Sequence, residues 1–405
     1  MTAKDLEQML DLAEPWQVTS LEIDHAASTA RLRVECAATT WADPATGEAL
    51  HIHGWQERTW RHLDFWQYET VLVARVPRVR NPSSGETMVV AVPWAAPHSR
   101  WTLAFERLAL EVLLAARSIE DACQLLRLHW DSSHKIIERA VHRGLARRED
   151  KPMAHVGIDE KSFGRGHRYA TVLSDIDGRR VLEVTSGATK EAAVAAIRSL
   201  PTVQQQSVAA VAMDRSPTYQ AAVEEALPQA QIVHDAYHLS ADLNKAVDQV
   251  RRREHAEFLA QGDPTLTNTK YLWLTNPLNL SSEKLTRFEA LARLSLKTSR
   301  AWEIKELFGG FWEQPGALQG AEYFAKWHRR TQRCRLEPMK KLGRSFKASL
   351  PRLLNWFAHP ISNALAEGFN SVIQAIKSAA RGFRNFAHYR VRILFLLGKL
   401  DLSLP

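Results

Sequence analysis

The spacing of apolar residues first follows the pattern of strands. Between residues 16 and 95, short runs of β-branched and other apolar residues alternate with segments rich in Pro, Gly, Asn and Asp. Runs of this kind predict a small β-rich module, which we assign to residues 1–99. The predicted strands are 21–23, 30–36, 70–76 and 88–92, and the predicted turns are 42–47 and 81–85.

From residue 100 onward the apolar residues recur at helical spacing. One helix is predicted over 103–113 and a second over 119–126, where Ser118 and Asp121 form a variant of the capping box. A third helix follows, with Asp131 or Ser132 expected as its N-cap.

The third helix is basic on one side. Its spacing turns Ile136 and Val141 inward and Lys135, Arg139 and Arg143 outward. Short helix, tight turn and basic helix predict a helix-turn-helix domain at residues 100–150 that contacts DNA through these three cations. A helical hairpin that never touches DNA has the same pattern and remains the alternative.

In residues 151–239 the spacing of apolar residues alternates between that of strands and that of helices. Three strands come first, and they continue into units of helix and strand. This element order predicts the first part of an RNase H-like catalytic core. The predicted strands are 155–161, 169–174, 181–185, 208–213 and 231–233, and the predicted helices are 192–200 and 218–227.

The segment 240–359 has a helical pattern throughout and predicts a large helical insertion. The last helices of the core would then lie in residues 360–405. The predicted fold class is therefore an α+β / α/β multidomain protein. Its RNase H-like core carries an all-helical insertion and is preceded by a small β module and a helix-turn-helix.

Composition narrows the class of protein. No stretch approaches the roughly 18 apolar residues of a membrane helix, and the acidic first residues do not resemble a signal peptide. Cys36, Cys123 and Cys334 are scattered without a CxxC pair, which fits a reducing compartment. We therefore expect a soluble cytoplasmic protein with no membrane partner.

The chain is basic, with a formal net charge of +8, and its positive residues are clustered. One cluster spans 326–347 and another spans 376–392, the latter with Lys377, Arg381 and Arg384. Each cluster alone could be a solvated helix face. Together they favour a surface for double-stranded DNA, because cations gain free energy by releasing counterions from phosphates. The interleaved Phe383, Phe386 and Tyr389 either stack on bases or pack internally.

Three carboxylates stand where a fold could direct them to one point. Asp159 interrupts an apolar strand, Asp214 directly follows another, and Glu367 lies on a helical pattern. Clustered carboxylates can hold two hard divalent cations, and the lack of nearby Cys or paired His favours Mg²⁺ or Mn²⁺. Each residue alone is more often a cap, a turn residue or an exposed helical glutamate.

The motifs resemble those of bacterial insertion-sequence DDE transposases of the ISL-three family. The resemblance runs from residue 54 nearly to the end of the chain and is carried by GIDEKSFGRGHRYATVLSDIDGRRVLEVTSG, MDRSPTY, HDAYHLSADLNKAVDQVRR, KYLWLTNPLNLS and ALAEGFNSVIQAIKSAARGFRNFAHYRVRILF. It implies that Asp159, Asp214 and Glu367 are the catalytic, metal-binding acids. It also implies cleavage at terminal inverted repeats followed by strand transfer. Asp235 and His238, in the family's HDAYHL signature, are secondary candidates.

One region departs from the family pattern. Members usually begin with a zinc module whose cysteines form a CxxC pair and a later Cys-Pro. Here Cys36 stands alone, Thr39 takes the place of a second cysteine, and Asn-Pro replaces the later pair. Zn²⁺ needs about four thiolate or imidazole ligands, so zinc is not expected. We expect instead a metal-free core built on Trp55, Trp60 and Trp66.

Two other functions remain open on the residues alone. An RNase H-like nuclease or resolvase would need the same acids without strand transfer, and a regulator could retain a silent catalytic fold. The whole-chain resemblance favours the transposase. Bringing two DNA ends together requires at least a dimer, so we expect a homodimer or larger assembly on DNA.

Overall fold

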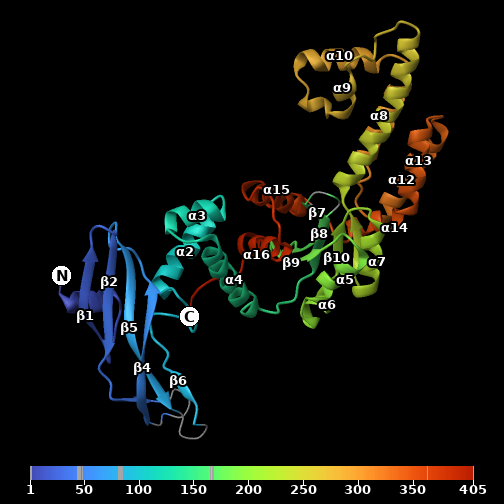
Figure 1. The fold of residues 1–405 in the computed structure, drawn as a ribbon. Coiled ribbons are helices and arrows are strands. Elements are labelled where there is room, and N and C mark those ends of the chain that lie inside the picture. The colour runs from blue at the N-terminus through green and yellow to red at the C-terminus, as the bar shows by residue number, and fades with distance from the viewer. Residues whose placement is uncertain are drawn as a thin grey trace. The chain divides into compact units, whose positions relative to one another are not determined.

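The computed structural model describes residues 2–42, 47, 49–80, 85–164, 166, 168–362 and 364–404. The chain forms two compact units (Figure 1). Unit 1 comprises Met1–Arg148 together with Leu400–Pro405, and unit 2 comprises Glu149–Lys399. The turns predicted at 42–47 and 81–85 lie mostly outside the described residues.

Unit 1 begins with a six-stranded sheet in the order β1-β2-β5-β4-β3, with β6 paired to β5. The strands β2 and β5 are parallel, and the other pairs are antiparallel. A strand lies at each predicted position, but β3 and the longest strand, β4, were not predicted. The elements are α1 Ala3–Met9, β1 Trp16–Asp24, β2 Thr29–Cys36, β3 Thr40–Ala42, β4 Ala49–Arg61, β5 Glu69–Arg80 and β6 Thr87–Val89.

A tryptophan cluster forms the centre of this module. The rings of Trp16 and Trp60 meet Trp94 edge to face, at centroid distances of 4.7 and 5.5 Å. The prediction that Trp55 and Trp66 belong to the core is wrong, because they are 39% and 80% exposed. Trp55 is an odd number of positions from Trp60 and therefore faces the other side of β4, and Trp66 lies between β4 and β5.

Three helices complete unit 1: α2 Leu103–Ala115, α3 Ile119–Leu126 and α4 Trp130–Ala146. The capping box of Ser118 and Asp121 at α3 is confirmed. The N-cap of α4 is His129, so the predicted caps Asp131 and Ser132 are wrong and lie in the first helical turn. Backbone hydrogen bonds between Arg61 and residues 100 and 102 join the sheet to α2.

Unit 2 contains a five-stranded sheet in the order β11-β10-β7-β8-β9. The strands β7, β8 and β9 are antiparallel neighbours, whereas β10 and β11 run parallel to β7. Every predicted strand and both predicted helices are present, and α6 was missed. The elements are β7 His155–Gly164, β8 Arg168–Asp175, β9 Arg180–Ser186, α5 Lys190–Arg198, α6 Thr202–Ser207, β10 Ala210–Met213, α7 Pro217–Ala226 and β11 Gln231–His234.

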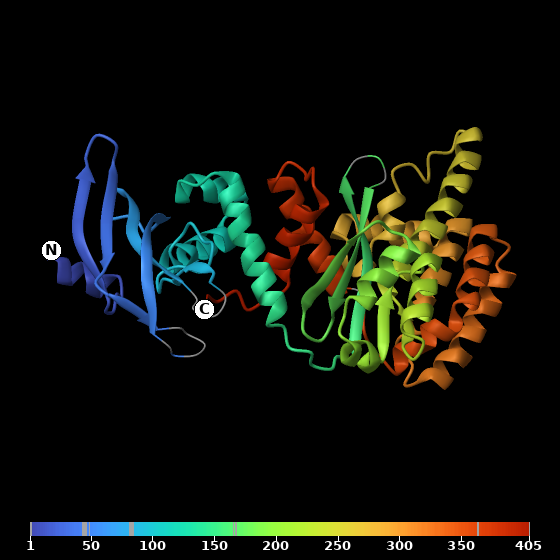
Figure 2. The ribbon, with the colours of Figure 1, turned by 60° about the horizontal axis from the view of Figure 1, so that its bottom comes forward.

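The two faces of this sheet are covered by different helices. Val156, Ile158, Val211 and Met213 pack in the core that contains α5 and α7. The other face carries the short residues Ala210 and Ala212, which pack with Ile361 and Trp356. The helices α15 and α16, drawn in red in Figure 2, lie on the opposite side of the sheet from α5 and α7. The elements of this C-terminal part are α14 Leu350–Leu354, η2 Asn355–Phe357, α15 Ala364–Ala379 and α16 Phe386–Leu397.

Between β11 and α14 the described chain is helical. The long helix α8 extends from the sheet, with α9 and α10 packed near its far end (Figure 1). Buried Glu254 on α8 accepts hydrogen bonds from the backbone nitrogens of Lys297 and Thr298, at 2.6 and 2.8 Å, and so caps α11. The elements are α8 Ala236–Ala260, α9 Lys270–Leu274, η1 Pro277–Asn279, α10 Ser282–Ala292, α11 Lys297–Gly309, α12 Ala317–Arg333 and α13 Glu337–Ala348.

A membrane-spanning helix must be both long and strongly apolar. Within the described residues, no helix combines that length with that apolar character.

Candidate active site

Three aspartates lie next to one another across three neighbouring parallel strands, Asp159 within β7 and Asp214 and Asp235 directly after β10 and β11. Ala212 pairs with Gly157, and Met213 pairs with His234. The register therefore aligns Asp214 with Asp159 on one side and with Asp235 on the other. Because side chains alternate along a strand, all three face away from the core that contains α5 and α7. Carboxylates thus gather at the carboxyl edge of the sheet, where α/β proteins commonly bind ligands.

Asp159 is held by two hydrogen bonds. Its Oδ1 accepts from the backbone nitrogen of Glu160 at 2.8 Å, and its Oδ2 accepts from Nδ2 of Asn370 at 2.6 Å. Burial raises the pKa of Asp159; these two hydrogen bonds oppose the rise, and the charge of Asp214 adds to it. A divalent cation would relieve the same repulsion, so the oxygen donors fit a hard metal ion.

Glu367 comes from a helix and not from a strand. It lies on α15, which packs on β7. Its carboxylate lies with Asp235 and His238, and one ligand atom from each of the three lies within 4.8 Å of the others. Asp159 and Asp214 are not members of that group. Burial raises the pKa of Glu367, and the charge of Asp235 contributes to the rise. Glu367 thus forms a close group with the pair that the sequence treats as secondary.

Asp235 and His238 form a hydrogen-bonded pair at the start of α8. Nδ1 of His238 lies 3.1 Å from Oδ2 of Asp235, and Asp235 is almost completely buried. This hydrogen bond raises the pKa of His238, and the negative charges of Asp235, Asp214 and Asp159 act in the same direction. The pair therefore belongs to the same electrostatic cluster as the aligned aspartates.

The turn after β10 is fixed to the helical segment. Oδ1 of Asp214 accepts from the backbone nitrogen of Ser216 at 3.0 Å. The next residue, Arg215, pairs with Asp242 on α8 at 3.0 Å, and its guanidinium lies 5.1 Å from the ring centre of Phe346 on α13. Arg215 also donates to Ser345. These contacts connect the position of one aspartate to the packing of two helices.

Asn370 is the site residue that sequence reasoning missed. It lies one helical turn after Glu367, so both side chains share the face of α15 that points to the strands. The spacing indicated that shared face, but nothing in the sequence indicated Asp159 as its partner. The next turns of α15 are also attached to β7, because Nζ of Lys377 donates to the carbonyl oxygen of Ser162 at 2.9 Å.

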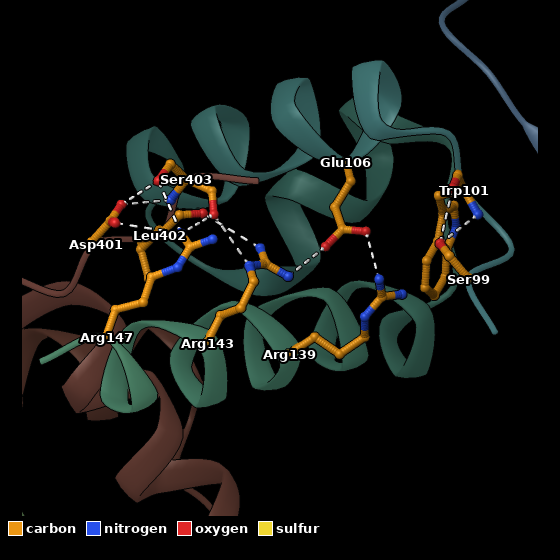
Figure 3. A network of polar contacts seen from close by, with 9 residues as sticks. All are labelled: Ser99, Trp101, Glu106, Arg139, Arg143, Arg147, Asp401, Leu402 and Ser403. Carbon is orange, nitrogen blue, oxygen red and sulfur yellow. Dashed lines mark hydrogen bonds and ion pairs between the residues drawn. The ribbon is translucent and has the colours of Figure 1, made fainter. Parts of the chain in front are cut away.

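Two of the expected DNA contacts on α4 have an internal partner instead. Figure 3 shows Arg139 and Arg143 pointing to Glu106 on α2, at 3.0 and 3.3 Å. Glu106 is fully buried, so both cations compensate a charge that is shielded from water. The prediction that Arg139 and Arg143 point outward is therefore wrong, whereas Lys135 is exposed.

The same network attaches the C-terminal segment to α4 (Figure 3). Arg147 donates to the carbonyl oxygen of Ser403 at 2.7 Å, and Arg143 donates to the same oxygen at 3.2 Å. Gly144 permits this approach, because a Cβ at that position would lie 2.6 Å from Cβ of Leu400. Residues 400–403 thus form part of unit 1.

The aromatic residues near the last basic cluster pack internally. Tyr389 is fully buried, and its ring contacts Phe163, Phe383 and Phe386 at centroid distances of 5.1, 5.2 and 6.2 Å. Arg381 and Arg384, by contrast, are exposed. Of the two alternatives, stacking on bases or packing internally, the structure shows internal packing for Tyr389.

Aligned carboxylates on such a sheet, in a basic chain with a helix-turn-helix pattern, are consistent with a DDE transposase, and the comparisons with known proteins show that class. A family model described as a transposase, of the DDE type, matches residues 156–393. A model described as the helix-turn-helix domain of transposase family ISL3 matches residues 90–141. The chain belongs to the ISL3 (ISL-three) family of transposases, and it is an enzyme that acts on DNA.

Curated relatives agree with this assignment. The chain is 25% identical over 348 residues to the transposase for insertion sequence element IS1001 of Bordetella parapertussis, which covers 84% of this chain and 85% of the relative. It is 28% identical over 353 residues to the transposase for insertion sequence element IS1557 of Mycobacterium tuberculosis, covering 81% and 79%. Similarity thus extends over most of each protein.

A third model, described as a zinc-finger of related transposases, matches residues 46–80. That segment contains His51, His53 and His62 but no cysteine. His62 is buried with Nδ1 2.9 Å from Oγ1 of Thr102, and burial lowers its pKa to about 4. These donors do not fit a zinc finger, which needs about four thiolate or imidazole ligands. The matched strands β4 and β5 contribute Trp60 and Leu72 to the core that contains the tryptophan cluster.

Proposed function

We propose that unit 2 is an RNase H-like catalytic core interrupted by a helical insertion. The core would comprise residues 151–239 and the helices after residue 360, and the insertion would comprise residues 240–359. The supporting observation is the strand order, an antiparallel meander of three strands extended by two parallel ones. Helices on both faces of this sheet are consistent with the same architecture.

We further propose that Asp159, Asp214 and Glu367 hold two divalent cations, Mg²⁺ or Mn²⁺, with Asp235 and His238 in a supporting role. The alignment of the aspartates on β7, β10 and β11 carries this proposal. Bound cations would activate a water or a 3′ hydroxyl and stabilise the leaving oxygen of an in-line phosphoryl displacement. An all-oxygen donor set is the one that such hard cations prefer.

The chain's own residues would prepare this chemistry. Asn370 fixes the Asp159 carboxylate in one orientation, and the backbone nitrogen of Ser216 does the same for Asp214. Arg215 links the turn after β10 to α8 and α13, so the aspartate cannot move without disturbing that packing. Preorganised ligands of this kind lose less conformational freedom when the metal and the DNA bind.

DNA recognition would be divided between the units. The helix-turn-helix at residues 100–150, with exposed Lys135, would bind the terminal inverted repeats beside the β module at residues 1–99. Lys377, Arg381 and Arg384 would contact phosphates near the active site. Cleavage at the repeats would be followed by strand transfer, and a homodimer or larger assembly would hold the two ends.

A cleavage and joining assay tests the proposed chemistry. Purified protein, Mg²⁺ or Mn²⁺ and labelled DNA from the flanks of the coding sequence would be compared with Asp159→Asn and Glu367→Gln. We expect nicks at the repeat ends and joined products from the unaltered protein, and neither from the variants, which should still bind DNA. Cleavage without joining would favour a nuclease, and cleavage that persists in both variants would refute the site.

A further inference from the structure

The helical segment contains a basic groove between α11 and α12. It has a volume of about 470 Å³, and its charged lining is strongly positive. We call it the α11–α12 groove. Its lining residues are Arg300, Glu303, Ile304, Lys326, Arg329, Arg330, Arg333 and Cys334.

Most of this positive charge is uncompensated. Arg330 pairs with Glu303 at 3.0 Å. In the described part of the chain, no carboxylate lies within 4 Å of Arg300, Lys326, Arg329 or Arg333. Like charges at positions three and four apart on one helix repel each other. A polyanion in the groove would remove that repulsion.

The groove is built on a rigid base. The opposite side of α12 buries Phe324 and Trp327, and Nε1 of Trp327 donates to the carbonyl oxygen of Ile304 on α11 at 2.8 Å. The ring of Trp327 also lies 4.8 Å from that of Phe308. The two helices are thereby fixed, so an anion would find its cations already positioned.

The dimensions of the cation row favour duplex DNA over a small anion. Lys326, Arg329 and Arg333 span two helical turns, or roughly 10 Å along α12. One strand of a duplex presents about three phosphates over that distance. The residues that line the groove include no aromatic side chain, so none of them could stack on a base.

We propose that the α11–α12 groove is a second DNA-binding site, separate from the carboxylate site, that holds the phosphate backbone of a duplex without reading its bases. The proposal rests on the proposed function, because it assigns part of the same DNA to the insertion. Its ligand is the duplex backbone, whatever the base sequence, and it needs no metal.

Cys334 provides a local probe in the unaltered protein. It is the partly exposed cysteine, whereas Cys36 and Cys123 are buried and burial raises the pKa of both thiols. Alkylation of Cys334 by iodoacetamide in EDTA, followed by mass spectrometry, reports access to the groove. We expect duplex DNA to slow this reaction at least about tenfold, whatever its sequence. Inorganic phosphate at the same phosphate concentration should not.

Charge-matched variants test the same site by its salt dependence. Arg329→Gln with Arg333→Gln should lower the slope of log K against log salt by about 1.8, because two phosphate contacts are lost at about 0.9 each. Lys270→Gln with Lys284→Gln removes the same charge from α9 and α10 and should leave the slope unchanged.

The outcomes separate this site from the catalytic one. Equal slopes in both double variants, absence of protection at Cys334, or protection by inorganic phosphate equal to that by DNA would each overturn the groove proposal. Asp159→Asn should show normal protection and a normal slope, since it alters only the carboxylate site. Failure of the catalytic proposal would therefore appear in the cleavage assay alone.

Discussion

Asn370→Ala is the substitution that most directly tests how the acidic site is held. It removes the 2.6 Å hydrogen bond to Oδ2 of Asp159 and leaves the rest of α15 unchanged. Hydrogen bonds to charged groups contribute roughly 1.5–3 kcal/mol. Asn370 is only half-buried, so water can partly replace it and the lower end applies. A loss of about 1.5–2 kcal/mol corresponds to a metal affinity that is roughly 10- to 30-fold weaker.

The metal dependence of DNA cleavage measures this effect. We expect the Mg²⁺ concentration for half-maximal rate to rise roughly 10- to 30-fold, with most of the activity recovered at saturating metal. The hydrogen bond from Asn370 also lowers the pKa of Asp159. Its loss should therefore raise the pKa of Asp159 further and move the acid limb of the rate profile to higher pH.

Gln374→Ala provides the matched control, because Gln374 is exposed one turn further along the same helix. It should leave both the metal dependence and the pH profile unchanged. Our reasoning would be refuted by an Asn370→Ala enzyme whose half-saturating metal concentration stays within twofold of the unaltered value. A loss of rate at saturating metal, with no change in metal dependence, would equally contradict a positioning role.

Three further predictions concern unit 1. Glu106→Gln should destabilise it by roughly 2–3 kcal/mol, because two cations lose a buried partner; unchanged hydrogen exchange in α2 and α4 would contradict this. In the folded protein the pKa of His62 is lowered from 6.5 to about 4. As the pH falls, the unfolded chain therefore takes up a proton at this residue before the folded protein does. Stability should then fall by about 3 kcal/mol between pH 6.5 and 4, and His62→Gln should remove most of that dependence in urea unfolding. Deleting residues 400–405 should cost about 1–3 kcal/mol and speed exchange at the C-terminal turns of α4, unlike the substitution Asp401→Asn, which keeps the carbonyl acceptors.

The element order of unit 2 could be predicted because its strands and helices have distinct periods. The sequence also suggested that Asp159 and Asp214 could be directed to one point, since Asp159 interrupts one apolar strand and Asp214 directly follows another. Their alignment itself comes from the register of β7 and β10. The strand β4 was missed because polar or charged residues occupy much of its length, with Gln56, Glu57 and Arg58 in succession, and only Leu50 and Trp60 are buried. Its identity depends on pairing with β5, which local spacing does not encode.

Contacts between distant residues were the part that sequence could not supply. Asn370 and Asp159 are 211 residues apart, and Arg143 and Glu106 are 37 apart. A run of cations predicts exposure only when no buried acid lies opposite. Glu106 reads as an ordinary helical glutamate, so the internal role of its two arginine partners becomes evident only from the packing of α2 on α4.

The segment that completes unit 1 is encoded after the whole of unit 2. Because a nascent chain emerges from its N-terminus, the sheet and α2–α4 can form early, while Arg143 and Arg147 still lack their carbonyl partners in residues 402–403. A polypeptide that stops anywhere within unit 2 therefore carries its helix-turn-helix in a less stable form. The order of synthesis thus makes completion of unit 1 depend on prior synthesis of the whole of unit 2.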